Sequence, residues 1–298
     1  MANSSVVMHV KNIKNVTGKQ KVFSVIGMIL RYAFLLLVAV SVLFPFYWMI
    51  ISSLKSATEY SLPVPTFWPK QVMWSNYAVA FSTANLGTLF KNTVLVGIVS
   101  TVLSLVVTVL SAFAFARLEF KGKNLLFGAL LATMMIPGEM FTISNYVTVV
   151  QFGWLNTYTA LIVPFLVSVF YIYLLRQNFM QIPNELYLAA KVDGTSDLKY
   201  LWKVMIPLAL PTIISITILK MMGAWNSYLW PKLVADDELH QLVSNGLRGA
   251  AFVDPDTQKT NYPMQMAAVV IVSAPLFAVF IFLRKYIMKG VSRSGIKG

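Results

Sequence analysis

Residues 183–211 read PNELYLAAKVDGTSDLKYLWKVMIPLALP and form a polar, helix-breaking island between two segments that are apolar enough to cross a membrane. A short helix is expected to start at Asn184 and Glu185, because such side chains favour the first turn of a helix. Its apolar face, at i, i+3 and i+4, would consist of Leu186, Ala189 and Ala190. The two small alanines would let a partner approach closely, so the segment is a candidate contact surface.

A fixed bend is expected directly after this helix. Asp193 favours turns and Gly194 tolerates a positive φ, so the pair would stop the helix, and Asp193 is the candidate side chain for holding the bend. Thr195 or Ser196 can then cap a second short helix that runs through Trp202. On spacing alone, an ordinary loop on the membrane surface explains the segment equally well.

The composition places the chain in a membrane. Of its 298 residues, 57% are hydrophobic and only 12% are charged, which is far more apolar than a soluble domain. A helix needs roughly 20 apolar residues to span the hydrocarbon core. Six stretches of that order are predicted as spans: 32–54, 92–116, 125–150, 158–175, 204–231 and 260–283. The predicted fold class is an all-α integral membrane protein, with the third span broken by Glu139 and the fifth by Lys220.

Charge fixes the expected orientation. Most of the 24 Lys and Arg residues fall in the tails and in every second loop, so the positive-inside rule puts both termini and the island in the cytoplasm. The predicted division is a basic tail over 1–31 with an interfacial helix at 17–31, a six-span domain over 32–284, and a second tail over 285–298. Residues 178–206 form the cytoplasmic loop between spans four and five, and residues 232–259 form the longest outer loop.

Several function classes are disfavoured. The net charge is +13, and the basic residues lie at span ends rather than among exposed aromatic residues. This placement favours anionic lipid over nucleic acid as a partner. His9 and His240 have no acids at metal-ligand spacing, so neither a metal site nor a catalytic site is expected. The sequence contains no Gly-x-x-x-x-Gly-Lys-Ser/Thr phosphate loop, so the chain is not expected to hold ATP.

The island resembles the EAA loop of permease subunits in ATP-driven, binding-protein-dependent importers, specifically those of the maltose-type carbohydrate branch. The matching positions are Glu185, Ala189, Ala190, Asp193, Gly194, Leu201 and Pro207. One position departs from the pattern, because Leu188 stands where the family has the glutamate that names the loop. A polar contact of that glutamate would be missing, while the docking role of the loop remains.

The resemblance covers nearly the whole chain, and further motifs follow in family order: Asn76-Tyr77, Lys91-Asn92-Thr93, Met135-Ile136-Pro137, Trp225-Asn226 and the closing Ser294-Gly295-Ile296-Lys297-Gly298. It implies a bacterial or archaeal cytoplasmic membrane, a second similar permease, a cytoplasmic ATPase dimer and an extracytoplasmic sugar-binding protein. The ATPase, not this chain, would hold ATP and Mg²⁺. By the same resemblance, the loop contacts the ATPase and residues 294–298 add a second contact. Residues 232–259 would receive the binding protein.

Two ionisable residues within the spans are candidates for the transport pathway. Charge in a bilayer is costly unless it faces water or a partner, so Glu139 and Lys220 should face the protein interior and could pair with each other. Alternatively, Glu139 lies in water near the end of its span and Lys220 pairs with the second permease. Further candidates combine aromatic faces with hydrogen-bonding groups, as sugar sites do; they are Asn145, Tyr146, Trp225, Asn226 and Tyr228.

Three functions remain open from the sequence. The favoured one is a transport subunit of an ATP-driven importer of a di- or oligosaccharide. A secondary transporter driven by an ion gradient is the alternative, since Glu139 could carry a coupling ion. A membrane-embedded enzyme is disfavoured, because no catalytic cluster is visible. A glycerol phosphate or another polyol derivative also remains open as the solute.

Overall fold

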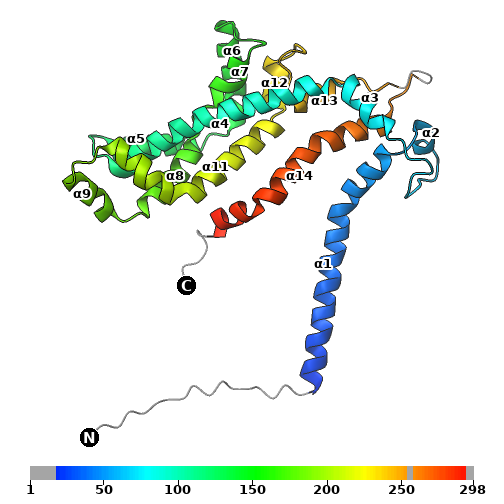
Figure 1. Ribbon diagram of the computed structural model, residues 1–298, viewed down its shortest axis with the longest axis horizontal. Coiled ribbons are helices and arrows are strands. Elements are labelled where there is room, and N and C mark those ends of the chain that lie inside the picture. The colour runs from blue at the N-terminus through cyan, green and yellow to red at the C-terminus, as the bar shows by residue number, and fades with distance from the viewer. Residues whose placement is uncertain (1–17, 254–257, 293–298) are drawn as a thin grey trace.

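The computed structural model describes residues 18–253 and 258–292, and within them the regular secondary structure is helical apart from one isolated bridge between Val253 and Thr260. Helices follow one another along the whole described chain (Figure 1). Their bounds are α1 Gly18–Ser53, α2 Ala57–Tyr60, α3 Ser75–Thr83, α4 Leu86–Arg117, α5 Lys123–Thr133, η1 Gly138–Phe141, α6 Thr142–Gln151, α7 Tyr158–Ile162, η2 Val163–Phe165, α8 Val169–Met180, α9 Asn184–Val192, α10 Asp197–Tyr200, η3 Leu201–Met205, α11 Ile206–Asn226, α12 Leu229–Val234, α13 Val243–Gly249 and α14 Tyr262–Ser292. The all-α prediction is confirmed for this part of the chain.

Four of the described helical segments are long and apolar enough to cross a membrane, namely 25–53, 86–117, 197–226 and 262–282. Two bent pairs raise the number to six if each pair is one span. The pair α5 and η1–α6 is bent by 88°, and the pair α7–η2 and α8 is bent by 47°. The predicted count of six spans is therefore the upper limit of what the helices allow.

Three predicted boundaries need correction. The expected interfacial helix over 17–31 is not separate, because α1 runs unbroken from Gly18 through Ser53. The fifth span ends at Asn226 rather than at Pro231, because Ser227 adopts an extended conformation and the chain restarts as α12. The break in the third span lies at Pro137, where the chain is extended, and Glu139 follows it inside η1.

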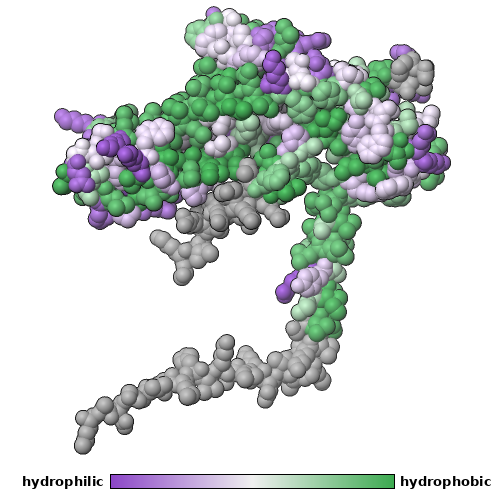
Figure 2. Space-filling view, in the orientation of Figure 1, coloured by the Kyte–Doolittle hydropathy of each residue, from purple (hydrophilic) through white to green (hydrophobic). Residues whose placement is uncertain are grey.

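The spans are arranged around α4, which packs against both α8 and α11. Helix α14 packs on α3 and α11, and α1 packs on α14 and then leaves the rest of the molecule (Figure 1). The surface over α4 and α1 is largely hydrophobic, whereas polar residues gather at the ends of the molecule (Figure 2). Only 6% of the most apolar window of α1 is buried within this chain, so α1 offers its surface to lipid or to a partner.

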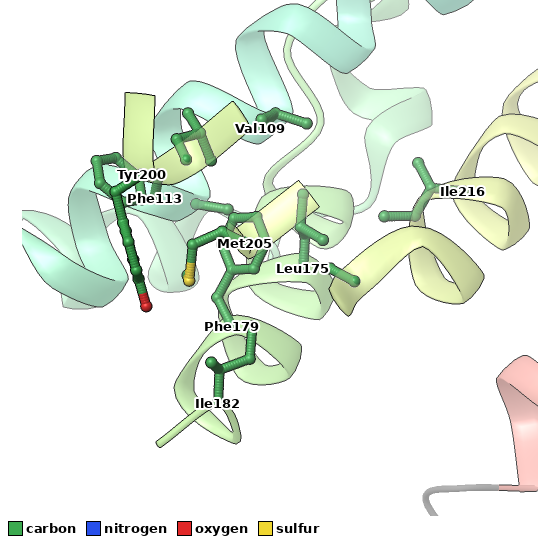
Figure 3. Close-up of a cluster of buried hydrophobic side chains, with 11 residues drawn as sticks. Val109, Phe113, Leu175, Phe179, Ile182, Tyr200, Met205 and Ile216 are labelled. Carbon is green, nitrogen blue, oxygen red and sulfur yellow. The ribbon is translucent and has the colours of Figure 1, made fainter. Parts of the chain in front are cut away.

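The largest buried cluster joins the ends of α4, α8 and α11 (Figure 3). Its members are Val109, Ala112, Phe113, Leu175, Phe179, Ile182, Tyr200, Leu201, Met205, Ala209 and Ile216. Two further clusters lie elsewhere, one around α6, α7 and α12 and one around α3, α13 and α14. The first cluster contains residues of α10 and η3, so the island predicted from the sequence is part of the same packed unit as the spans.

Two arginines join α4 and α8 at this end. Arg117, the last residue of α4, donates hydrogen bonds from Nη2 to the carbonyls of Phe179 at 2.9 Å and Ile182 at 2.5 Å. In return, Arg176 of α8 donates from Nε to the carbonyl of Phe115 at 3.0 Å. Carbonyls at helix C-termini have no partner within the helix, and a cationic donor satisfies them well. The exchange holds the two helix ends at a fixed separation.

Replacing Arg117 with Gln is expected to lower the stability of the protein by roughly 2–4 kcal/mol, because two carbonyls inside the structure lose a charged donor. Thermal unfolding of the purified protein in detergent measures the effect. Lys121→Gln removes an exposed charge from the turn after α4 and is the matched control, with an expected change of at most about 0.5 kcal/mol. Equal melting temperatures for the two variants would contradict this role of Arg117.

Candidate functional site

The island forms an elbow, defined here as residues 184–200, in which α9 and α10 meet at Gly194. Helix α9 starts at Asn184, as predicted, and ends with a backbone capping pattern. The amide of Thr195 donates to the carbonyl of Ala190 at 2.8 Å, and the amide of Gly194 donates to that of Lys191 at 3.1 Å. This Schellman motif requires a left-handed residue, and Gly194 has φ +69°. The predicted bend at Gly194 is confirmed.

The side chain that holds the bend is Asp197 and not Asp193, the residue favoured from the sequence. Asp197 accepts a hydrogen bond from the hydroxyl of Tyr187 at 2.8 Å and forms an ion pair with Lys191 at 2.6 Å. These contacts join α9 to α10 across the turn. The contact with Asp197 also raises the pKa of Lys191 above its ordinary value. Asp193 is the C-cap of α9, and its side chain makes no hydrogen bond or ion pair within the described residues.

The elbow is attached to the spans through one face of α9 and the end of α10. Tyr200 is buried and its ring lies 5.2 Å from that of Tyr187, centroid to centroid. Tyr187 and Ala190 pack against the cluster of Figure 3. The prediction that Leu186, Ala189 and Ala190 share one face was therefore partly wrong. Ala190 faces the core together with Tyr187, whereas Leu186 and Ala189 are exposed. Ser196 caps α10, as allowed by the prediction.

The second helix of the elbow does not end at Trp202. Helix α10 continues through one π-helical turn, η3, directly into α11, so residues 197–226 form one helical segment. Leu201 is fully buried in the cluster at this junction. Pro207 is the second residue of α11, which directly follows the π-helical turn, so within the continuous helix it leaves one carbonyl of the preceding turn without a backbone donor. The elbow is therefore joined to α11 by continuous helix.

The outer surface of the elbow carries large apolar side chains among exposed polar ones. Its exposed side chains include Leu186, Leu188, Val192, Leu198 and, just beyond it, Trp202, of which Val192 is 88% exposed. Glu185 and Ala189 are also exposed. Exposed apolar side chains on a short helix such as α9, outside the long apolar spans, are typical of a protein contact surface. Val192, Leu198 and Trp202 were not predicted as part of this surface, although their spacing from Leu188 was visible in the sequence.

Lys220 lines an open cavity of about 380 Å³ near the break between η2 and α8. Its ammonium group donates a hydrogen bond to the carbonyl of Phe165 at 2.6 Å. The expected pair with Glu139 is absent, because Glu139 makes no ion pair within the described residues and does not line this cavity. The carbonyl of Phe165 is left without a helical partner at the bend, which explains why Lys220 turns toward it.

The other predicted pathway residues do not share this cavity. Trp225, Asn226 and Tyr228 line a second cavity of about 240 Å³, where the guanidinium of Arg248 lies 4.3 Å from the centroid of the Tyr228 ring. Hydrogen bonds from Lys232 and then Arg248 lower the pKa of the Tyr228 hydroxyl.

Glu139, Asn145 and Tyr146 lie beyond the 88° bend, on η1 and α6. Glu139 is exposed, and Tyr146 packs against the cluster around α6, α7 and α12. None of the three lines either cavity. The seven predicted residues therefore fall in three separate places.

The loop over 232–259 is anchored to the spans by side-chain amides. Asn92 of α4 donates to the carbonyls of Leu239 at 2.7 Å and Gln241 at 2.9 Å, and its own carbonyl oxygen accepts from the hydroxyl of Tyr158 at 2.7 Å. Asn245 donates to the carbonyl of Ala235. Residues 254–257 lie outside the described residues, as does the predicted contact segment 294–298.

Replacing Asp197 with Asn is expected to loosen the elbow, because the ion pair with Lys191 is lost. Both side chains are partly exposed, so solvent screening keeps the loss small. Amides at the end of α9 should then exchange with deuterium roughly two- to fivefold faster. Asp193→Asn is the matched control with no such contact. Equal exchange in both variants would show that Asp197 does not hold the bend.

Comparison with known proteins identifies the family. The model of the family described as the binding-protein-dependent transport system inner membrane component matches residues 104–293. The arabinooligosaccharides transport system permease protein AraQ of Halalkalibacterium halodurans is 31% identical over 283 residues, covering 94% of this chain and 100% of that protein. The diacetylchitobiose uptake system permease protein NgcG of Streptomyces coelicolor is 29% identical over 266 residues, covering 89% and 87%.

The fold also matches a solved structure. A bacterial ABC transporter involved in the import of the acidic polysaccharide alginate contains a chain with a TM-score of 0.79 and 24% identity, covering 91% of this chain and 98% of that one. This likeness concerns the fold, and the family model and AraQ carry the assignment. The chain belongs to the family of inner membrane components of binding-protein-dependent transport systems.

Proposed function

We propose that this chain is the permease subunit of an ATP-driven importer that carries a sugar, most simply a di- or oligosaccharide, across a bacterial or archaeal cytoplasmic membrane. The family membership and the sugar-specific names of AraQ and NgcG support this function. The secondary transporter kept open by the sequence is not favoured, because the family depends on a binding protein. Both termini and the elbow lie in the cytoplasm in this proposal, in keeping with the positive-inside rule.

The proposed coupling to an ATPase is supported by one observation, namely the packed elbow with its exposed apolar side chains. A cytoplasmic ATPase dimer docks on this surface, and it holds the ATP and Mg²⁺ while this chain binds no cofactor. The predicted docking residues Glu185, Leu188 and Ala189 are all exposed on α9 and are accessible to such a partner. Leu188 in place of the usual glutamate makes this contact more apolar and removes one charged hydrogen bond.

Movement reaches the spans through the junction of α10 and α11. Closure of the ATPase pushes the elbow, and Tyr200 and Leu201 transmit that push because both are buried between α4 and α8. Packed elements move as rigid bodies rather than deform. Since η3 joins α10 to α11 without a break, the movement is passed along α11 toward Lys220 and its cavity.

The remaining partners follow from surfaces that this chain leaves uncovered. A second, homologous permease packs against the exposed spans and completes the pathway between the two subunits. The outer loop over 232–259, fixed by Asn92, receives the extracytoplasmic binding protein that delivers the sugar. Anionic lipids contact the basic residues at the span ends.

Gly194→Val is expected to reduce recovery of the ATPase and to reduce uptake at least fivefold. A β-branched residue at φ +69° is strained by roughly 1–2 kcal/mol, whereas no atom lies within 4 Å of an added Cβ, so the effect comes from the backbone alone. Gly194→Asn is the matched control, because Asn accepts the left-handed conformation. The Gly194→Asn variant should retain at least half of the ATPase recovery and at least half of the uptake.

Purification of the tagged complex in mild detergent, followed by mass spectrometry, tests the whole assembly. A second permease and an ATPase should be recovered with the unaltered chain and with the Gly194→Asn variant, and recovery of the ATPase should fall with the Gly194→Val variant alone. Uptake should fail on ATP depletion and survive collapse of the ion gradient. A stable chain without an ATPase, or uptake that follows the ion gradient, would contradict the proposed function.

A further inference from the structure

Lys220 is the only charged side chain among the residues that line its cavity. The cavity lies between α4, α8, α11 and α12, and its polar lining consists of Ser100, Ser168, Tyr171, Lys220, Ser227 and Trp230. No acidic side chain is among the residues that line it. The cavity is large enough for a group such as a sugar ring.

The ammonium group of Lys220 has unused hydrogen-bonding capacity. It carries three N–H donors, and one of them is accounted for by the carbonyl of Phe165 at 2.6 Å. None of the ion pairs among the described residues involves Lys220. A cation within a span is costly unless an anion or water offsets it. The side chain is therefore poised to take an anionic partner from within the cavity.

The surroundings of Lys220 suit a charged saccharide. Helix α8 starts at the cavity wall with Ser168 as its N-cap, so the positive end of its dipole adds to the field of the ammonium group. The indole ring of Trp230 and the hydroxyl of Tyr171 supply the apolar face and the polar atom that sugar rings use. Lys220 supplies the full positive charge of the cavity, and the helix end reinforces it.

We propose that this cavity binds an anionic group of the transported solute, with Lys220 as its charge partner, so that the solute is an acidic saccharide bearing a carboxylate or a phosphate. This inference rests on the proposed transport function and narrows its substrate. The Lys220 ammonium donates to the anionic oxygens, and the serine hydroxyls donate to the same group or to ring hydroxyls. Neutral sugars would leave the lysine charge without a partner and would enter less readily.

The absence of cysteine from the sequence makes a direct test possible. Gly223 lies one helical turn after Lys220, lines the same cavity and has open space for a new side chain. Gly223→Cys in the purified complex is labelled with sulfonatoethyl or trimethylammonioethyl methanethiosulfonate, which are anionic and cationic reagents of similar size. The mass of this chain reports the labelling rate. Ser82→Cys, on the exposed end of α3, is the control variant.

The anionic reagent should react about tenfold faster than the cationic one with the Gly223→Cys variant, relative to the same ratio for the Ser82→Cys variant. Adding Lys220→Gln should bring the ratio to within twofold of the control, and Lys220→Arg should preserve it. An unchanged ratio with Lys220→Gln, or no preference with Lys220 present, would overturn the proposal. So would an unreactive thiol in the Gly223→Cys variant, since the cavity would then be closed in the complex, for instance by an acidic side chain of the second permease.

A second measurement identifies the solute class. Cells of the source organism and cells lacking this chain are grown on a mixture of neutral and acidic oligosaccharides and sugar phosphates, and the solutes depleted from the medium are profiled by mass spectrometry. Cells that contain this chain should deplete solutes with a carboxylate or a phosphate, and cells that lack it should leave those solutes in the medium. Dependence limited to neutral sugars would overturn this inference while sparing the proposed function. No dependence for any saccharide would contradict the proposed function itself.

Discussion

The burial of Tyr200 and Leu201 between α4 and α8 is the contact on which the rest of the structure depends. It joins a polar segment to three spans in one packed cluster (Figure 3). Arg117 and Arg176 reinforce this contact, because each donates a hydrogen bond to a carbonyl of the other's helix. A surface loop lacking such contacts could bind a partner, but it could not pass on a displacement. Under the proposed function, this packing lets an ATPase that docks on the elbow move the spans.

The breaks in the spans follow a second constraint. Backbone groups in lipid must find partners, so an interrupted helix is tolerated only where protein or a cavity supplies them. At the 47° bend before α8, Lys220 satisfies the carbonyl of Phe165 and Ser168 caps the new helix. The same residues line the cavity of about 380 Å³. The irregular backbone and the candidate binding site are thus two aspects of one feature, and α11 links both to the elbow.

The sequence predicted what local chemistry controls. The apolar stretches, the start of α9 at Asn184 and the turn at Gly194 follow from spacing and backbone preference, and all three are found in the structure. The role of Asp197 could not be predicted, since it depends on how α9 folds back to bring Tyr187 and Lys191 near it. The predicted ion pair between Glu139 and Lys220 was wrong for a similar reason, because Glu139 lies beyond the 88° bend. Long-range contacts are set by the angles between helices, which hydrophobic patterns do not specify.

The most direct test of the central claim asks what the elbow touches in the assembled transporter. Val192 is 88% exposed at the end of α9, and a Val192→Cys variant would carry the only cysteine in the chain. A benzophenone maleimide attached there forms a covalent bond with its nearest neighbour when illuminated. We expect a dominant adduct between this chain and the ATPase, identified by mass spectrometry. An adduct with lipid or with the second permease alone, in a complex that contains the ATPase, would contradict this role of the elbow.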